Sequence, residues 1–187
     1  MRIIAFYTVN TPYEEEARIW QESFKDENYH VFSVESRGSW EENCAIKPEI
    51  IRQAFELFPK EDILYVDIDG RRKNPIPPSV PNPHVPGICF WNQRWNFNVR
   101  ELLSSTLYIP NNPLGKKMVD LWINYQLQNP KIWDQKVLQH VVEKHEIPHD
   151  VLGYEWISMD KHINPPFAYI HHEQASRRHK RNIRRVT

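Results

Sequence analysis

Apolar residues in the first third of the chain form two kinds of pattern. Nearly continuous runs at residues 2–9 and 63–66 are typical of strands covered on both faces, and residues 29–34 alternate towards a third strand. Apolar residues at helical spacing follow Pro12 and Pro48, and proline suits the first turn of a helix. The resulting order β-α-β-α-β predicts a mostly parallel sheet with helices on its faces.

The rest of the chain predicts further strands and helices. The expected strands are residues 87–91, 102–109 and 167–170, with one or two short strands between 147 and 156, and the expected helices begin at Asn112-Pro113 and Trp133-Asp134. Residues 75–86 contain six prolines and predict an extended, stiff excursion rather than a domain linker. The 187 residues suffice for one domain with a substantial core. We therefore expect a single α/β domain over residues 1–175.

Charge is distributed unevenly along the chain. The 24 basic and 24 acidic residues balance, yet residues 176–187 hold six Lys or Arg residues and no acid. The body is therefore acidic, and residues 176–187 form a basic tail. Such a tail is most often a solvated charge run, but it could also contact phosphate groups through Arg177 or bind nucleic acid.

The cysteines and the apolar segments indicate the cellular compartment. Cys44 and Cys89 are far apart and match neither a disulfide framework nor the spacing of zinc ligands, which predicts reduced thiols. The first residues turn polar too soon for a signal peptide, and no segment approaches the ~20 apolar residues of a membrane span. We therefore expect a cytoplasmic protein without a transmembrane segment.

Two carboxylates follow the apolar run at residues 63–66. Asp67 and Asp69 are one residue apart, and Gly70 comes next. The carboxyl edge of an open α/β sheet is where ligands bind. Two hard oxygen ligands there suit Mg²⁺ or Mn²⁺, and such an ion in turn suits a diphosphate. Taken alone, the motif is common and favours an acidic turn that binds nothing, and the neighbouring features reverse that preference.

Other polar residues stand at the ends of expected elements. His171 and His172 follow the last strand and could supply a third metal ligand if that strand joined the same sheet, or they could be a surface feature. Lys47 stands at a helix start, which is an anion site, although it could equally be a solvated lysine. Asp134 is a good N-cap behind a core Trp133, or Asp134 and Gln135 could hydrogen-bond sugar hydroxyls.

These segments, taken in order, resemble the glycosyltransferases of the GT-A fold, which use nucleotide-diphospho-sugar donors. The resemblance covers roughly residues 1–178 and rests on Tyr7-Thr8-Val9-Asn10, Ser39-Trp40 ahead of Lys47-Pro48, Leu64-Tyr65-Val66-Asp67-Ile68-Asp69, Ser105-Thr106-Leu107-Tyr108, Trp133-Asp134-Gln135 with Leu138, and His171. It implies a single-domain, Rossmann-like fold whose mixed, mostly parallel sheet is flanked by helices.

The resemblance also implies roles for individual residues. The residues implied for the nucleotide-sugar are Thr8, Asn10, Lys47, Asp67, Gln135 and Arg177. Those implied for Mn²⁺ or Mg²⁺ are Asp67, Asp69 and either His171 or His172. Asp134 is the implied catalytic residue, either as a base on the acceptor hydroxyl or as a nucleophile or stabilising group.

The function expected from these observations is metal-dependent transfer of a sugar, most simply from a UDP-sugar, to an acceptor hydroxyl. The acceptor could be a glycan, a protein or a lipid-linked sugar, and the basic tail keeps modified DNA bases among the candidates. A nucleic-acid-associated protein is the alternative, although the acidic body counts against it. A phosphatase or nucleotidyltransferase could use the same two carboxylates, but it would not need the late histidines or Trp133-Asp134-Gln135.

Overall fold

A computed structural model describes residues 1–92, 100–159 and 163–178 of the chain. Within these residues, a six-stranded sheet forms the centre of the fold, with strand order β2-β1-β3-β6-β5-β7. Its strands are β1 (Arg2–Thr8), β2 (Tyr29–Val34), β3 (Ile63–Val66), β5 (Gly87–Asn92), β6 (Arg100–Ile109) and β7 (Asp150–Val151). Neighbouring strands pair in parallel except for β6, which runs antiparallel to both β3 and β5. The predicted mixed α/β fold is confirmed.

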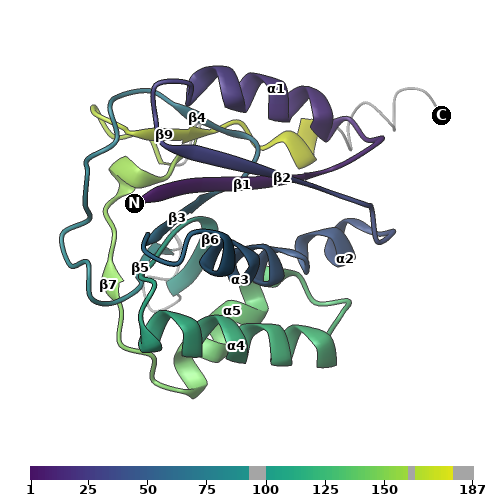
Figure 1. Cartoon of the computed structure of the whole chain (residues 1–187), viewed down its shortest axis with the longest axis vertical. Helices are drawn as coiled ribbons and strands as arrows, with labels where there is room; N and C mark the ends of the chain where they lie inside the picture. The colour runs from purple at the N-terminus through teal and green to yellow at the C-terminus, as the bar shows by residue number, and fades with distance from the viewer. Residues whose placement is uncertain (93–99, 160–162, 179–187) are drawn as a thin grey trace.

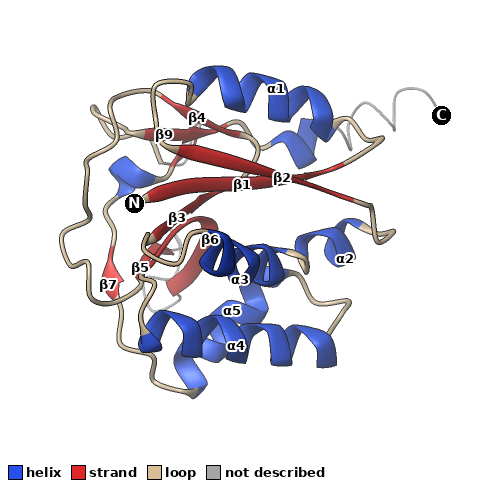
Figure 2. Ribbon diagram, in the orientation of Figure 1, coloured by secondary structure: helices blue, strands red, loops and turns tan. Residues whose placement is uncertain are grey.

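Helices and a small second sheet cover the two faces of the central sheet (Figures 1 and 2). On one face lie α3 (Lys47–Leu57), α4 (Pro113–Gln128) and α5 (Asp134–Lys144). On the other lie α1 (Tyr13–Ser23), the 3-10 turn Tyr154–Trp156 and a sheet of strand order β4-β9-β8, made of β4 (Gly70–Arg72), β8 (Ser158–Met159) and β9 (Ile170–His172). None of the helices in the described part of the chain is both long and apolar enough to cross a membrane.

The continuous apolar run of β3 is explained by burial on both faces. Ile63 and Tyr65 pack in the core beneath α3, α4 and α5, whereas Leu64 and Val66 pack in the core beneath α1. All four residues are at most 1% exposed. Because successive side chains of a strand point to opposite faces, only an apolar residue at every position fills both cores. Because β3 is packed on both faces, the position of Asp67, which follows it directly at the edge of the sheet, is fixed.

The helix α2 (Trp40–Cys44) was not predicted. It is a single short helix with no buried residue. A capping box begins it: the Glu42 amide donates to Ser39 Oγ (3.2 Å), and the Ser39 amide donates to Glu42 Oε2 (2.8 Å). The Ser-x-x-Glu signature was visible in the sequence, but the helix has no apolar stripe to accompany it.

The last strand is not where the sequence pattern placed it. It spans Ile170–His172 rather than residues 167–170, and it joins the small sheet instead of the central one. There it runs antiparallel to β4, with His172 opposite Gly70. Because β4 begins directly after a tight turn closed by the Gly70 amide on the Asp67 carbonyl (2.8 Å), this pairing still brings His172 close to Asp69. Residues 75–86 form neither helix nor strand, as their prolines predicted.

Candidate functional site

A cavity of about 490 Å³ lies where the carboxyl ends of β1 and β3 meet the first residues of α3 and α5. The predicted site residues that line it are Thr8, Lys47, Asp67, Asp69, Asp134 and Gln135. Asn10, His171, His172 and Arg177 are not among its lining residues. A second cavity of the same volume lies between β5, β6 and the end of α5, and it is lined by none of the predicted residues.

Lys47 forms the centre of the cavity floor. Its Nζ atom lies 2.7 Å from Asp134 Oδ2 and 3.0 Å from Asp67 Oδ1, and it donates to the carbonyl and hydroxyl oxygens of Ser104 (3.2 and 3.1 Å). Only 3% of the residue is exposed. Burial alone would lower the pKa of Lys47, but Asp134 and Asp67 raise it above its ordinary value. The side chain is buried between two carboxylates, so the alternative of a solvated lysine is wrong.

Asp134 points into the cavity and does not cap its own helix. The N-cap of α5 is Trp133, which makes no side-chain capping bond, and Asp134 is the first helical residue. Its Oδ2 atom accepts a hydrogen bond from Ser104 Oγ (2.8 Å) in addition to the Lys47 ion pair. Trp133 was expected in the core but is 38% exposed, and its ring meets that of Trp40 edge to face at 5.7 Å. Both residues line the cavity.

Gln135, next to Asp134, forms hydrogen bonds with two residues of β6. Its Nε2 donates to Glu101 Oε1 (3.0 Å), and its Oε1 accepts from the Ser104 amide (3.4 Å). These bonds tie the start of α5 to β6, so that Asp134 and Ser104 keep their relative positions.

Asp67 and Asp69 differ in their surroundings although they share one turn. Asp67 Oδ1 accepts from the Tyr65 hydroxyl (2.8 Å) and pairs with Lys47, while Asp67 Oδ2 makes no polar contact with a described residue. Burial raises the pKa of Asp67, against the opposing charge of Lys47. Burial would raise the pKa of Asp69 too, but the hydrogen bond with His172, the hydrogen bond from the Ala175 amide and the nearby charge of Arg71 lower it below its ordinary value.

The two histidines lie in different environments. His172 is 2% exposed, and both of its ring nitrogens are engaged: Nδ1 lies 3.3 Å from Asp69 Oδ1, and Nε2 lies 2.9 Å from Thr106 Oγ1. His171 alternates to the opposite face of the small sheet, where its Nδ1 lies 2.9 Å from Ser158 Oγ. His172 thus stands behind Asp69 and orients its carboxylate, while His171 stands away from the cavity.

The charged residues that line the cavity suit a divalent cation bound together with a phosphate ligand. The described residues include no group of three or more His, Cys, Asp or Glu arranged to hold a metal ion by themselves. Mg²⁺, however, is commonly bound by one or two carboxylates plus substrate phosphates and water. Asp67 and Asp69 meet that requirement, and Asp67 Oδ2 is the oxygen that the surrounding residues leave available.

Sequence reasoning missed several residues of the site. Ser104 bridges Lys47 and Asp134, and Tyr13, Trp40 and Cys44 complete the wall. The one available signal was the polar Ser104-Ser105-Thr106 segment inside an otherwise apolar strand, where buried hydroxyl groups need partners. Nothing in the sequence marked Tyr13 and Trp40 as cavity residues, because aromatic residues at such positions are equally common in a hydrophobic core.

Comparison with known proteins bears on the fold. No family model and no curated protein sequence matches the chain. Among solved structures, that of a glycosyltransferase involved in the glycosylation of the major capsid of PBCV-1 is similar, with a TM-score of 0.68 and 17% sequence identity over 97% of this chain and 98% of that one. At this identity, the likeness concerns the fold: the chain has, over nearly its full length, the fold of a glycosyltransferase.

Proposed function

We propose that the chain is a glycosyltransferase that takes its sugar from a nucleotide-diphospho-sugar, most simply a UDP-sugar, with the help of Mn²⁺ or Mg²⁺. The observation that carries the proposal is one cavity at the carboxyl edge of the sheet, where Lys47 pairs with Asp67 and Asp134 and where Asp69 also lies in the lining. The likeness in fold to a glycosyltransferase supports it over the full length of the chain.

The charge of the cavity supports a requirement for a cation. Its charged lining residues are one lysine and three aspartates, Lys47, Asp67, Asp69 and Asp134, which together carry a net charge of −2. A nucleoside diphosphate would be repelled by such a site, since like charges in a partly buried cavity repel strongly. Asp67 and Asp69 are the residues that would hold a divalent ion, which supplies Lewis-acid stabilisation of the departing diphosphate.

The remaining residues bind and orient the substrates. Thr8 and the loop that follows it would hold the base and ribose, with Tyr7 and Tyr13 as aromatic neighbours in the wall. Lys47 and Ser104 hold the carboxylate of Asp134 in one orientation. Asp134 would then act at the sugar, either as a base on the acceptor hydroxyl or as a nucleophile or stabilising group.

A glycan, a protein or a lipid-linked sugar is the proposed acceptor. Trp133 and Trp40, at the wall next to Asp134, offer apolar ring surface of the kind that packs against the faces of sugar rings. The nucleic-acid alternative depends on the basic tail. Of that tail the structure describes only Ser176–Arg178, and Arg178 is already paired with Glu16 and Glu173. Lys180, Arg181, Arg184 and Arg185 lie outside the described residues.

The proposal is tested by incubating the protein with nucleotide-sugars that differ in base and sugar, with Mn²⁺, and identifying the products. A glycosyltransferase without its acceptor releases nucleoside diphosphate and free sugar slowly, and EDTA stops the release. Release of nucleoside monophosphate and sugar phosphate would instead indicate a pyrophosphatase. Absence of any effect of nucleotide and metal, together with salt-sensitive binding to DNA, would support the nucleic-acid alternative.

A further inference from the structure

Arg71 is a charged residue buried directly behind the Asp67–Asp69 turn. It is the second residue of β4 and is 4% exposed. Its Nη1 atom donates to two main-chain carbonyls, those of Ile68 and Gly70, at 2.9 Å each. These two residues flank Asp69 on either side. One guanidinium nitrogen therefore fixes the backbone on both sides of the carboxylate proposed to hold the cation.

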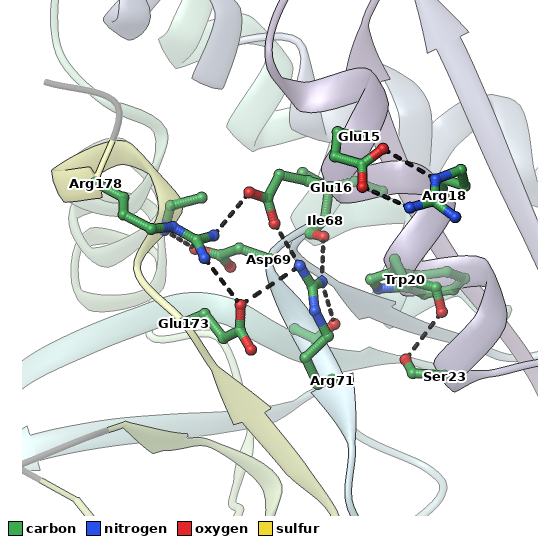
Figure 3. A network of polar contacts seen from close by, with 12 residues as sticks. Glu15, Glu16, Arg18, Trp20, Ser23, Ile68, Asp69, Arg71, Glu173 and Arg178 are labelled. Atoms are coloured by element: carbon green, nitrogen blue, oxygen red, sulfur yellow. Dashed lines mark hydrogen bonds and ion pairs between the residues drawn. The ribbon is translucent and has the colours of Figure 1, made fainter. Parts of the chain in front are cut away.

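The other terminal nitrogen of Arg71 connects this turn to two distant parts of the chain. Nη2 pairs with Glu16 of α1 and lies 3.7 Å from Glu173 Oε2, just after β9. Arg178 closes the arrangement, with its guanidinium 2.7 Å from Glu16 and 3.2 Å from Glu173. Figure 3 shows Arg71 between the helix and the C-terminal segment, with the four side chains facing one another. We call Glu16, Arg71, Glu173 and Arg178 the Arg71 network.

The C-terminal segment held by this network binds Asp69 directly. The Glu173 amide donates to the Asp69 carbonyl (3.1 Å), and the Ala175 amide donates to Asp69 Oδ2 (2.9 Å). Ser176, one residue further, lines the cavity. Asp69 is therefore held by Arg71 through the backbone of its own turn, and by residues 173–175 through its carbonyl and its carboxylate.

Stability alone does not account for burying Arg71 against Glu16. Removing two charges from water costs several kcal/mol per ion, and an apolar pair of similar size is often as stable or more stable. The planar guanidinium does offer something that an apolar side chain or a lysine lacks, namely several donors in a rigid fork. Here the fork serves two carbonyls and two carboxylates at once.

We propose that Arg71 is a positioning residue for Asp69, and that the Arg71 network holds the Asp69 carboxylate in the orientation needed for the cation and the donor diphosphate. The inference deepens the proposed function and rests on it. Residues that orient a metal ligand commonly change metal affinity by about 10- to 100-fold when they are replaced. The network should therefore govern the affinity for metal and donor more than the rate of the chemical step.

The test uses Arg71→Lys, which keeps the buried positive charge next to Glu16 but removes the fork. In the full-length protein, thermal shift with UDP would give the half-saturating concentration of Mn²⁺, and hydrogen exchange would report on the Ala175 amide. We expect about a tenfold rise in half-saturating Mn²⁺ and in donor KM, a change in kcat of less than threefold, and faster exchange at Ala175.

A second variant keeps the inference testable if Arg71→Lys does not fold. Arg178→Gln removes the outer cation, whose side chain is 48% exposed, and it should cause the same changes to a smaller extent. Arg18→Gln is the matched control, because Arg18 also lies on α1 but, among the described residues, its side chain pairs with Glu15 of its own helix and not with the Arg71 network (Figure 3). It should leave Mn²⁺ affinity and exchange at Ala175 unchanged.

Two unfavourable outcomes are distinguishable. If the unaltered protein binds UDP with Mn²⁺ but both network variants bind them with the same affinity, the positioning role is wrong while the proposed function stands. If no nucleotide and metal stabilise the unaltered protein, the proposed function is wrong and the positioning role falls with it. Faster exchange at the Ala175 amide in the variants would then show only that the Arg71 network holds residues 173–175 in place.

Discussion

Lys47 Nζ and Asp134 Oδ2 lie 2.7 Å apart, and each of the two residues begins a helix that packs on the same face of the central sheet. A cation at the first position of a helix is opposed by the helix dipole, so Lys47 does not stabilise α3 by its position. Its side chain is 4% exposed and that of Asp134 is 5% exposed. The ion pair is therefore part of the buried cavity lining, and it does not serve to stabilise the start of α3.

Replacing Lys47 with Met should leave Asp67 and Asp134 buried without their shared cation. Breaking one side of a buried ion pair typically costs about 3–5 kcal/mol, so the free energy of unfolding in urea should fall by about that amount. Release of nucleotide from a UDP-sugar should fall below detection. The control is Lys117→Met on the exposed side of α4, which should change neither quantity. Unchanged stability of Lys47→Met would contradict the ion pairs described for the cavity floor.

Replacing Asp69 with Ala should abolish sugar transfer while leaving the fold intact. The change removes a proposed metal ligand that lines the cavity. It also removes the partner of His172 Nδ1 and of the Ala175 amide, so the free energy of unfolding should fall without loss of the fold. The thermal shift with UDP and Mn²⁺ should disappear with the activity, whereas the circular dichroism spectrum should be unchanged. Asp120→Ala, on the exposed face of α4, is the matched control and should retain both. Full activity of Asp69→Ala would rule out the proposed metal site.

Cys44 should react slowly with iodoacetamide although it lines the cavity. Burial raises the pKa of the Cys44 thiol, and the charge of Asp134 adds to the effect while Lys47 opposes it. A raised pKa means that the reactive thiolate is scarcer at pH 8 than in a free cysteine. In a Cys89→Ala background, where Cys44 is the remaining cysteine, the rate should rise steadily from pH 8 to pH 10. A plateau near pH 9 would show an ordinary thiol.

Much of this site could be predicted because its residues sit at the ends of regular elements. The continuous apolar run of β3 identifies a strand buried on both faces, and Asp67 follows it directly. Lys47 and Asp134 each begin a helix with a clear apolar stripe. Topology then brings strand ends and helix starts to one edge of the sheet. Local patterns thus located the three residues at element ends, and the resemblance to glycosyltransferases of the GT-A fold assigned them to one site.

The rest of the site depends on pairings that local patterns do not encode. Strands β4 and β9 are three residues each, too short to show a periodicity, and they pair across about a hundred residues of chain. That pairing decides which histidine reaches Asp69 and which faces away. Arg71 reads in the sequence as an exposed loop residue after a glycine, and nothing near it indicates that Glu16 and Glu173 will surround it.

Gly70 should tolerate substitution poorly, because three groups crowd the place of a side chain there. A Cβ atom at residue 70 would lie 2.5 Å from Val66 Cγ1, 3.0 Å from the Asp67 carbonyl oxygen and 3.2 Å from His172 Cε1. Overpacking of this kind typically costs about 1–3 kcal/mol. Gly70→Ala should therefore lower the free energy of unfolding in urea by that amount and displace the turn that carries Asp69.

The matched control for Gly70→Ala is Gly153→Ala, where the three atoms nearest the added Cβ atom all belong to the carboxylate end of Glu155. That side chain can move aside, so stability and donor affinity should both be preserved. In Gly70→Ala, by contrast, the half-saturating concentration of Mn²⁺ measured with UDP should rise together with the loss of stability, because the backbone of β3 and β4 cannot yield without moving Asp69. If the two variants had the same free energy of unfolding and the same half-saturating concentration of Mn²⁺, the turn could adapt to the added methyl group. The packing around Gly70 would then not hold Asp69 in place.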